Sequence, residues 1–105
     1  MALHHVVSGE KIRLAPVDHP DSKTAALVKA ESFEAVQLVL RSGETIAPHA
    51  VPGFATILCV EGSVTLDAAK RVELEAGDWV YLERGERHAV VAHEDSSLLV
   101  TILFE

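Results

Sequence analysis

Two histidines beside apolar stretches are the residues of this chain best suited to chemistry inside a folded core. His49 precedes a Pro-Gly turn and an apolar run over residues 54–60, and His88 begins a second run over residues 88–91. An imidazole can donate or accept a hydrogen bond, transfer a proton near neutral pH, or bind a divalent transition metal at about 2.0–2.1 Å. A complete metal site has three or four protein ligands, so two histidines alone predict at most a weak metal site.

Few other side chains are candidates for further ligands of such a metal. They are Gln37, His93, His4 and His5. We expect His4 and His5 to be surface residues and poor partners for one ion, because neighbouring residues of an extended chain point to opposite sides. His93 precedes the polar turn 94–97 and is expected in an exposed loop.

The single cysteine, Cys59, lies in an apolar run and is predicted to be a small buried hydrophobe. One cysteine excludes an internal disulfide and a thiolate metal cluster within one chain. The sequence contains neither a glycine-rich phosphate loop nor a nucleophile elbow, so hydrolysis by a serine or cysteine nucleophile has no support.

The charge of the chain argues against two classes of partner. Sixteen acidic and nine basic side chains give a net charge of -7. Without a run of Lys or Arg there is no surface for phosphates or anionic lipids, so neither nucleic acid nor a membrane is an expected partner. No apolar run approaches the ~20 residues that cross a bilayer, and we expect a cytoplasmic protein.

Short apolar runs separated by turn signals dominate the chain from Val36 onward. Runs rich in Val, Ile, Leu and Thr, with Gly at close intervals, are typical of antiparallel sandwiches and barrels. They cover residues 36–40, 56–60, 64–66, 72–74, 79–82, 88–91 and 98–104. The sequence therefore predicts an all-β fold, and 105 residues suffice for one compact domain.

The segment 23–31 is ambiguous between strand and helix. Its residues are good helix formers and could form an amphipathic helix. Pro16 and Pro20 interrupt the chain ahead of it, and Glu31-Ser32 can turn one strand into the next. We predict a strand.

Several runs are apolar at both alternating positions, notably residues 37–40, 55–60 and 98–104. A strand of an isolated barrel has one face toward water, so apolar residues on both faces require a second covering layer. A homodimer is the simplest source of that layer. Trp79 and Tyr81 share a strand face and are predicted in the core or at this subunit interface, with a ligand cavity as the alternative.

From Gly43 onward, the spacing of glycines and histidines resembles the motifs of the cupin family. The first cupin motif runs Gly, five residues, His, one residue, His, three or four residues, Glu, six residues, Gly. Gly43, His49 and Gly62 stand at their positions in this motif. Val51 replaces the second histidine and Ala55 replaces the glutamate.

The second cupin motif runs Gly, five residues, Pro, one residue, Gly, two residues, His, three residues, Asn. Gly77, Gly85 and His88 match, whereas Glu83 stands at the proline position and Ala92 at the asparagine position. The chain thus resembles a small single-domain cupin, an RmlC-like jelly roll with a degenerate metal-binding motif.

The resemblance implies a cupin-type double-stranded β-helix, a jelly-roll barrel, as one domain over residues 1–105. Its barrel core is expected over residues 36–104, preceded by N-terminal strands within residues 1–35. Residues two apart on a strand share a face. Val51 is therefore expected beside His49, and Ala55, Ile57 and Cys59 are expected on one face of their strand.

We predict a mainly apolar pocket inside this barrel that binds a small molecule. Its expected ligand-binding residues are His49, His88, Val51, Ala55, Ile57 and Val90. His49 and His88 would also form the weak metal site, for which Zn, Ni, Fe, Mn and Cu are the candidate ions.

Three interpretations of the histidine pair stay open: other groups complete a weak metal site, the pair binds a small organic anion or polar group directly, or both rings are structural. The leading function is binding of a small molecule with the two histidines as polar anchors. The alternative is a metal-dependent cupin enzyme, dioxygenase- or isomerase-like, with an incomplete two-histidine site. A third class is a sensory or structural module, and the sequence does not decide whether the protein is an enzyme.

Overall fold

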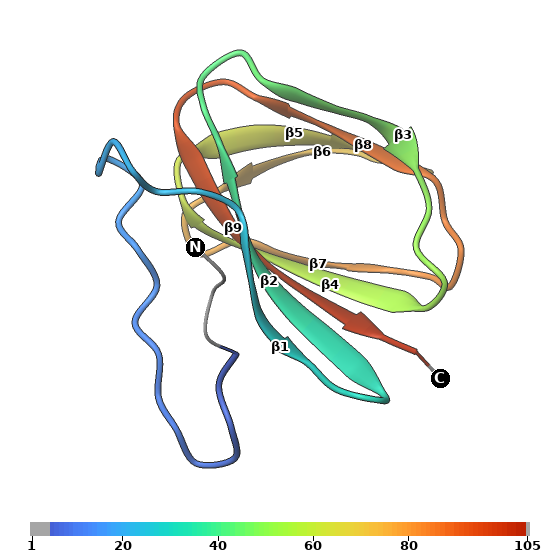
Figure 1. Ribbon diagram of the computed structural model, residues 1–105. Helices are drawn as coiled ribbons and strands as arrows, with labels where there is room; N and C mark the ends of the chain where they lie inside the picture. Colours follow the sequence, from blue (N-terminus) through green and yellow to red (C-terminus); the bar gives the residue numbers. More distant parts are fainter. Residues whose placement is uncertain (1–4, 105) are drawn as a thin grey trace.

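The computed structural model describes residues 5–104, and all of its regular structure there is β (Figure 1). No helix in this part of the chain is long and apolar enough to cross a membrane. The predicted all-β fold is confirmed. The strands are β1 (Ala25–Lys29), β2 (Phe33–Leu40), β3 (Thr45–His49), β4 (Phe54–Glu61), β5 (Ser63–Asp67), β6 (Arg71–Glu75), β7 (Trp79–Leu82), β8 (His88–Ala92) and β9 (Ser96–Leu103).

The strands form two antiparallel sheets that face each other. One sheet has the order β1-β2-β9-β4-β7 and the other has the order β3-β8-β5-β6. The chain passes from one sheet to the other after β2, β3, β4, β6, β7 and β8, as in a jelly roll. In Figure 1 the sheet of β3, β8, β5 and β6 lies above, with β2, β4 and β7 below it.

The core lies between the two sheets and is built by alternate residues of each strand. Ala55 and Ile57 of β4 are 2% and 3% exposed, and Val64 and Leu66 of β5 are 0% and 1% exposed. Side chains of a strand alternate between its two faces, so one apolar set per strand suffices to fill this interior.

Cys59 is the next inward residue of β4 and is fully buried in the same core. Burial raises the pKa of its thiol, and the negative charges of Asp78, Glu75 and Glu94 raise it further. The group therefore stays a neutral thiol, and the prediction of a small buried hydrophobe is confirmed.

The segment 23–31 contains β1, so the predicted strand is confirmed. β1 pairs with β2 along its length, from Ala25 opposite Gln37 to Lys29 opposite Glu34. Helix propensities differ by only tenths of a kcal/mol per residue, about 0.7 at most for ordinary residues. The sheet pairing and the burial of Leu27 outweigh that preference.

Within residues 1–35, where N-terminal strands were expected, the structure has β1 and the start of β2, whereas residues 5–24 form turns and irregular backbone. The Arg41 guanidinium holds residues 17–22 of this segment in turns, because it draws three main-chain carbonyl groups toward one point. It donates hydrogen bonds of 2.6, 3.1 and 3.0 Å to the carbonyl oxygens of Val17, His19 and Ser22, respectively.

The glycines that match the cupin motifs occupy backbone conformations that favour glycine. Gly43, Gly62, Gly77 and Gly85 all have positive φ, between 71° and 95°. Gly62 is additionally confined, because a Cβ atom there would overlap the Ser96 side chain and main chain. The space around Gly43 is open.

Gly62→Ala should destabilise the fold more than Gly43→Ala. Both changes place an alanine at positive φ, which costs about 1–2 kcal/mol. Only Gly62→Ala adds a steric clash with Ser96, so we expect a total loss above about 3 kcal/mol. Urea unfolding of both variants measures the difference, and equal losses would contradict this account.

Candidate functional site

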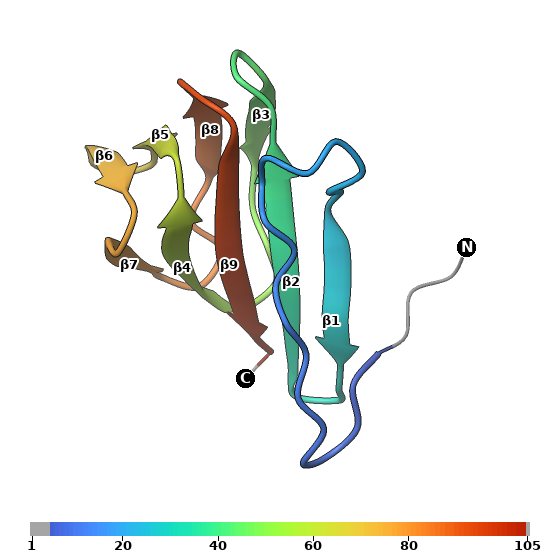
Figure 2. The same cartoon turned by 90° about the vertical axis from the view of Figure 1, so that its left-hand side faces the viewer.

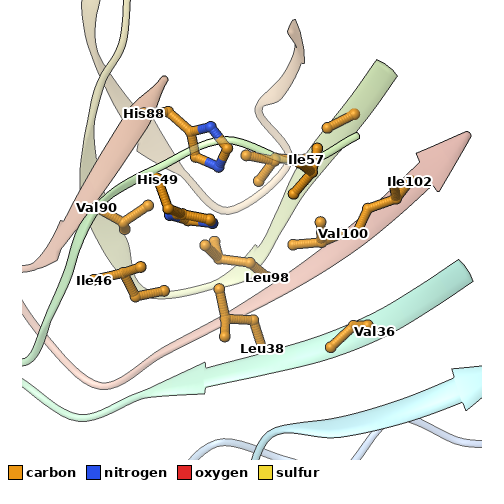
Figure 3. A pocket seen from close by; sticks show the side chains of 12 residues that line it. Val36, Leu38, Ile46, His49, Ile57, His88, Val90, Leu98, Val100 and Ile102 are labelled. Carbon is orange, nitrogen blue, oxygen red and sulfur yellow. The ribbon is translucent and has the colours of Figure 1, made fainter. Parts of the chain in front are cut away.

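A pocket of about 160 Å³ lies between the two sheets. β2, β4 and β9 line it from one sheet and β3 and β8 from the other, and their side chains converge in Figure 3. Two of its residues are histidines and all others are aliphatic. The lining residues are Val36, Leu38, Ile46, His49, Val51, Ala55, Ile57, His88, Val90, Leu98, Val100 and Ile102.

The structure brings all six predicted ligand-binding residues to this one pocket: His49, His88, Val51, Ala55, Ile57 and Val90. Their binding of a ligand stays a prediction. The sequence analysis missed the other six, of which Val36 and Leu38 lie on β2 and Leu98, Val100 and Ile102 on β9. Apolar residues occur at both alternating positions of these strands, so the pattern does not clearly indicate which set points inward.

A β-bulge in β3 places His49 opposite His88. Thr45 pairs with Val91 and Ile46 with Val90, and the register then shifts so that His49 pairs with His88. Ile46 faces the pocket, and regular alternation would bring Pro48 inward next. The shift replaces Pro48 with His49, and an edge strand such as β3 tolerates both the bulge and the proline.

The two imidazole rings have the same hydrogen-bonding pattern. Nδ1 of His49 is 3.2 Å from the carbonyl oxygen of Ala47, and Nδ1 of His88 is 3.0 Å from that of Glu86. A carbonyl oxygen only accepts, so Nδ1 donates in both rings. A neutral ring then has an unprotonated Nε2, which can accept a hydrogen bond or bind a metal.

The rings lie side by side at one end of the pocket (Figure 3), with centroids 4.3 Å apart and planes tilted by 54°. His88 is 7% exposed, whereas His49 is exposed. Ala55, Val90 and Leu98 are at most 2% exposed and form the inner wall. The pocket therefore runs from an imidazole pair near solvent to a closed aliphatic end.

The donor set does not fit a resident metal ion. Both rings are held as metal-binding histidines often are, with Nδ1 on a carbonyl group. No group of three His, Cys, Asp or Glu residues suitable for an ion occurs within residues 5–104. Val51 and Ala55 occupy the pocket wall at the positions where the cupin motif has histidine and glutamate, and neither can supply a ligand.

The further ligands considered from the sequence lie elsewhere. Gln37 points to the outer side of β2, where its amide donates to the Ala15 carbonyl oxygen at 2.9 Å and to Ser97 Oγ at 3.1 Å. His5 is exposed and does not line the pocket, and His4 lies outside the described residues. The proposal that Gln37 or His5 completes the metal site is therefore wrong.

His93 is also excluded as a third ligand. Its side chain is exposed, as predicted, and lies with Thr65 and Glu73 away from the pocket lining. Its Nε2 is 2.6 Å from Thr65 Oγ1, which in turn donates to Glu73 at 3.0 Å. These contacts tie the turn after β8 to β5 and β6.

Trp79 and Tyr81 lie on the edge strand β7 and are 60% and 47% exposed. Their exposure shows that the core interpretation is wrong for the monomer, and neither residue lines the histidine pocket. Tyr81 borders a different pocket of about 230 Å³, beside Lys70 and Glu86. The subunit interface remains as the prediction for these two residues.

Comparisons with known proteins agree with this architecture. A family profile described as a cupin domain matches residues 36–104. No match was found among curated protein sequences.

The solved structures that resemble the chain are cupins or share their fold. A conserved protein of unknown function from Streptococcus pyogenes has a TM-score of 0.79 at 18% identity, over 100% of this chain and 98% of its own. A cupin superfamily protein from Desulfitobacterium hafniense has a TM-score of 0.75 at 16% identity, over 78% and 76%. The polyketide cyclase RemF from Streptomyces resistomycificus has a TM-score of 0.68 at 22% identity, over 78% and 64%.

These identities establish the fold alone, whereas the match to the family profile covers the strands that build the pocket, from β2 to β9. With two antiparallel sheets, the motif glycines at positive φ and His49 opposite His88, the chain belongs to the cupin family.

Proposed function

We propose that this cupin binds a small, mainly apolar molecule in the barrel pocket, with His49 and His88 as its polar anchors. One observation carries the proposal: two imidazoles with free Nε2 atoms stand at the end of an otherwise aliphatic pocket of about 160 Å³. Apolar walls favour the body of the ligand, and the two nitrogens orient its polar group.

The enzyme alternative has less support. A positioned imidazole could transfer a proton, and RemF is named as a polyketide cyclase. Within residues 5–104, however, no carboxylate hydrogen-bonds to either pocket ring, because each Nδ1 is engaged by a main-chain carbonyl group. Dioxygenase chemistry would further need a metal, and the ligand set for it is incomplete.

The apolar outer face of the larger sheet supports a separate proposal about assembly. We propose that the protein forms a homodimer through the outer side of β4, β7 and β9. Trp79 and Tyr81 flank Leu58 and Thr56 there, and Leu99 continues the surface onto β9. The N-terminal segment crosses the outer side of β2, leaving these strands uncovered (Figure 2). Exposed Trp and Tyr are enriched at protein interfaces.

The charges at the two ends of β7 suit pairing with a second copy. Arg84 lies over the Phe54 ring, 4.6 Å from its centroid, at one end of β7, and Asp78 precedes Trp79 at the other end. A two-fold axis through the middle of the face brings the Arg84 end of one copy to the Asp78 end of the other. The protein would then act as a dimer with one pocket in each subunit.

Purified protein should contain far less than one equivalent of transition metal. Two imidazoles give weak binding only, so added Zn²⁺ or Ni²⁺ should bind loosely and binding should vanish in a His49→Ala, His88→Ala double variant. Elemental analysis and metal titration measure both. Near-stoichiometric metal that disappears in the double variant would contradict the metal-free pocket.

Ala55→Leu should block the pocket without unfolding the barrel. Its added carbon atoms enter the cavity, so affinity for toluene, an apolar probe, should fall at least about tenfold. NMR titration of the Ile57 and Val90 methyl groups measures binding. Ala89→Leu, on the opposite face of β8, is the matched control and should bind toluene as the unmodified protein does; equal loss in both variants would refute the assignment.

Trp79→Glu should convert the dimer to a monomer. Light scattering after gel filtration should show a mass of twice 11.3 kDa for the unmodified protein and 11.3 kDa for the variant. Val91→Glu is the control, because Val91 is 38% exposed on the other sheet and should leave the dimer intact. A monomeric unmodified protein at micromolar concentration would refute the homodimer.

A further inference from the structure

We infer that the pocket selects a single-ring phenol, whose hydroxyl group lies against His49 and His88 and whose ring lies among the aliphatic side chains. The inference rests on the proposed function and names its ligand class. The size of the pocket, its lack of charge and its hydrogen-bonding character each restrict the ligand independently.

The volume of the pocket limits the ligand to one ring. It measures about 160 Å³. An engineered apolar cavity of about 150 Å³ in another protein holds one benzene molecule. A six-membered ring with one small substituent therefore fills this pocket, whereas a fused ring system, a disaccharide or a nucleotide would extend out of it past the exposed His49.

The walls exclude charged and polyhydroxylated molecules. No lysine, arginine, aspartate or glutamate lines the pocket, so an ammonium group finds no opposite charge, and a carboxylate finds none while both imidazoles are neutral. A ligand ring would contact Ile57, Val90 and Leu98, which are at most 3% exposed. A sugar would bury hydroxyl groups against these side chains without partners, which opposes binding.

The two histidines require a hydrogen-bond donor on the ligand. Each Nδ1 donates to a carbonyl group, so each neutral ring presents Nε2 as an acceptor. No side-chain nitrogen or oxygen that is fully buried lacks a partner within residues 5–104. Nε2 of His88 forms no hydrogen bond there, so it borders accessible space, which for this residue is the pocket.

An O–H group satisfies this requirement better on an aromatic ring than on an aliphatic one. A phenolic hydroxyl titrates near pH ~10, far below an aliphatic alcohol, and is the stronger donor to an imidazole nitrogen. Aldehydes, ethers and ketones offer only acceptors, which would leave Nε2 of the buried His88 facing another acceptor. The pocket therefore selects ligands by their hydrogen-bond donor as well as by their size.

A ligand series on the unmodified protein tests the inference. Calorimetric or NMR titrations with phenol, toluene, anisole, cyclohexanol and benzoate vary the donor, the ring and the charge one at a time. We expect phenol to bind about tenfold more tightly than toluene, which has the same shape without the donor. Anisole should bind no better than toluene, and cyclohexanol and benzoate should bind more weakly than phenol.

A second measurement locates the effect at the histidines. In a His49→Leu, His88→Leu double variant the affinity ratio of phenol to toluene should fall to about one while toluene still binds. His93→Leu, outside the pocket, should keep the ratio of the unmodified protein. Should the double variant fail to fold, ¹⁵N NMR of the unmodified protein answers the question, because the Nε2 resonances of His49 and His88 should shift with phenol and not with toluene.

The outcomes separate this inference from the proposed function. Binding of toluene with phenol no tighter would overturn the phenol class and leave an apolar pocket. Tightest binding of benzoate or of cyclohexanol would overturn it in favour of an anion or an aliphatic alcohol. Failure of toluene and every other ligand in the series would overturn the binding function itself.

Discussion

The antiparallel ladder between β3 and β8 decides what the barrel interior can do, because it makes His49 and His88 direct cross-strand neighbours. Each ring is fixed by its own strand, through a carbonyl group two residues earlier, at Ala47 and at Glu86. Two local bonds and one bulge thus orient both Nε2 atoms without a side-chain partner. Every other property of the pocket follows from the aliphatic residues that surround this pair.

The same strands bury apolar side chains on one face and present them on the other. Leu98 points into the barrel and is fully buried, whereas its neighbour Leu99 lies opposite Leu58 on the outer face. The N-terminal segment covers part of that face at β2, where Gln37 bonds to Ala15. The outer side of β7 keeps Trp79 exposed at 60%, so the monomer leaves part of its apolar surface in water.

The fold was predictable because it depends on local signals that the sequence states directly. Gly62 and Gly77 stand at the turns that their motif positions marked, and Ala55, Ile57 and Cys59 share the inward face of β4, as expected. No local pattern indicated the bulge between Ile46 and His49. The inward-facing residues of β2 and β9 could not be identified either, because apolar residues occur at both alternating positions of these strands. The path of residues 5–24 depends on long-range side-chain contacts from Arg41, Gln37 and Glu61, which no local pattern encodes.

The replacement of two motif residues changes the kind of ligand that the interior can hold. A divalent cation bound by two neutral imidazoles would carry its full charge into an aliphatic pocket, because Ala55 removes the carboxylate that would offset it and Val51 removes a third nitrogen. A neutral molecule has no such charge to desolvate, and one O–H group is enough to satisfy an Nε2 acceptor. The apolar substitutions therefore weaken metal binding and favour a neutral organic ligand at the same two histidines, since removing charge and adding aliphatic surface act in the same direction.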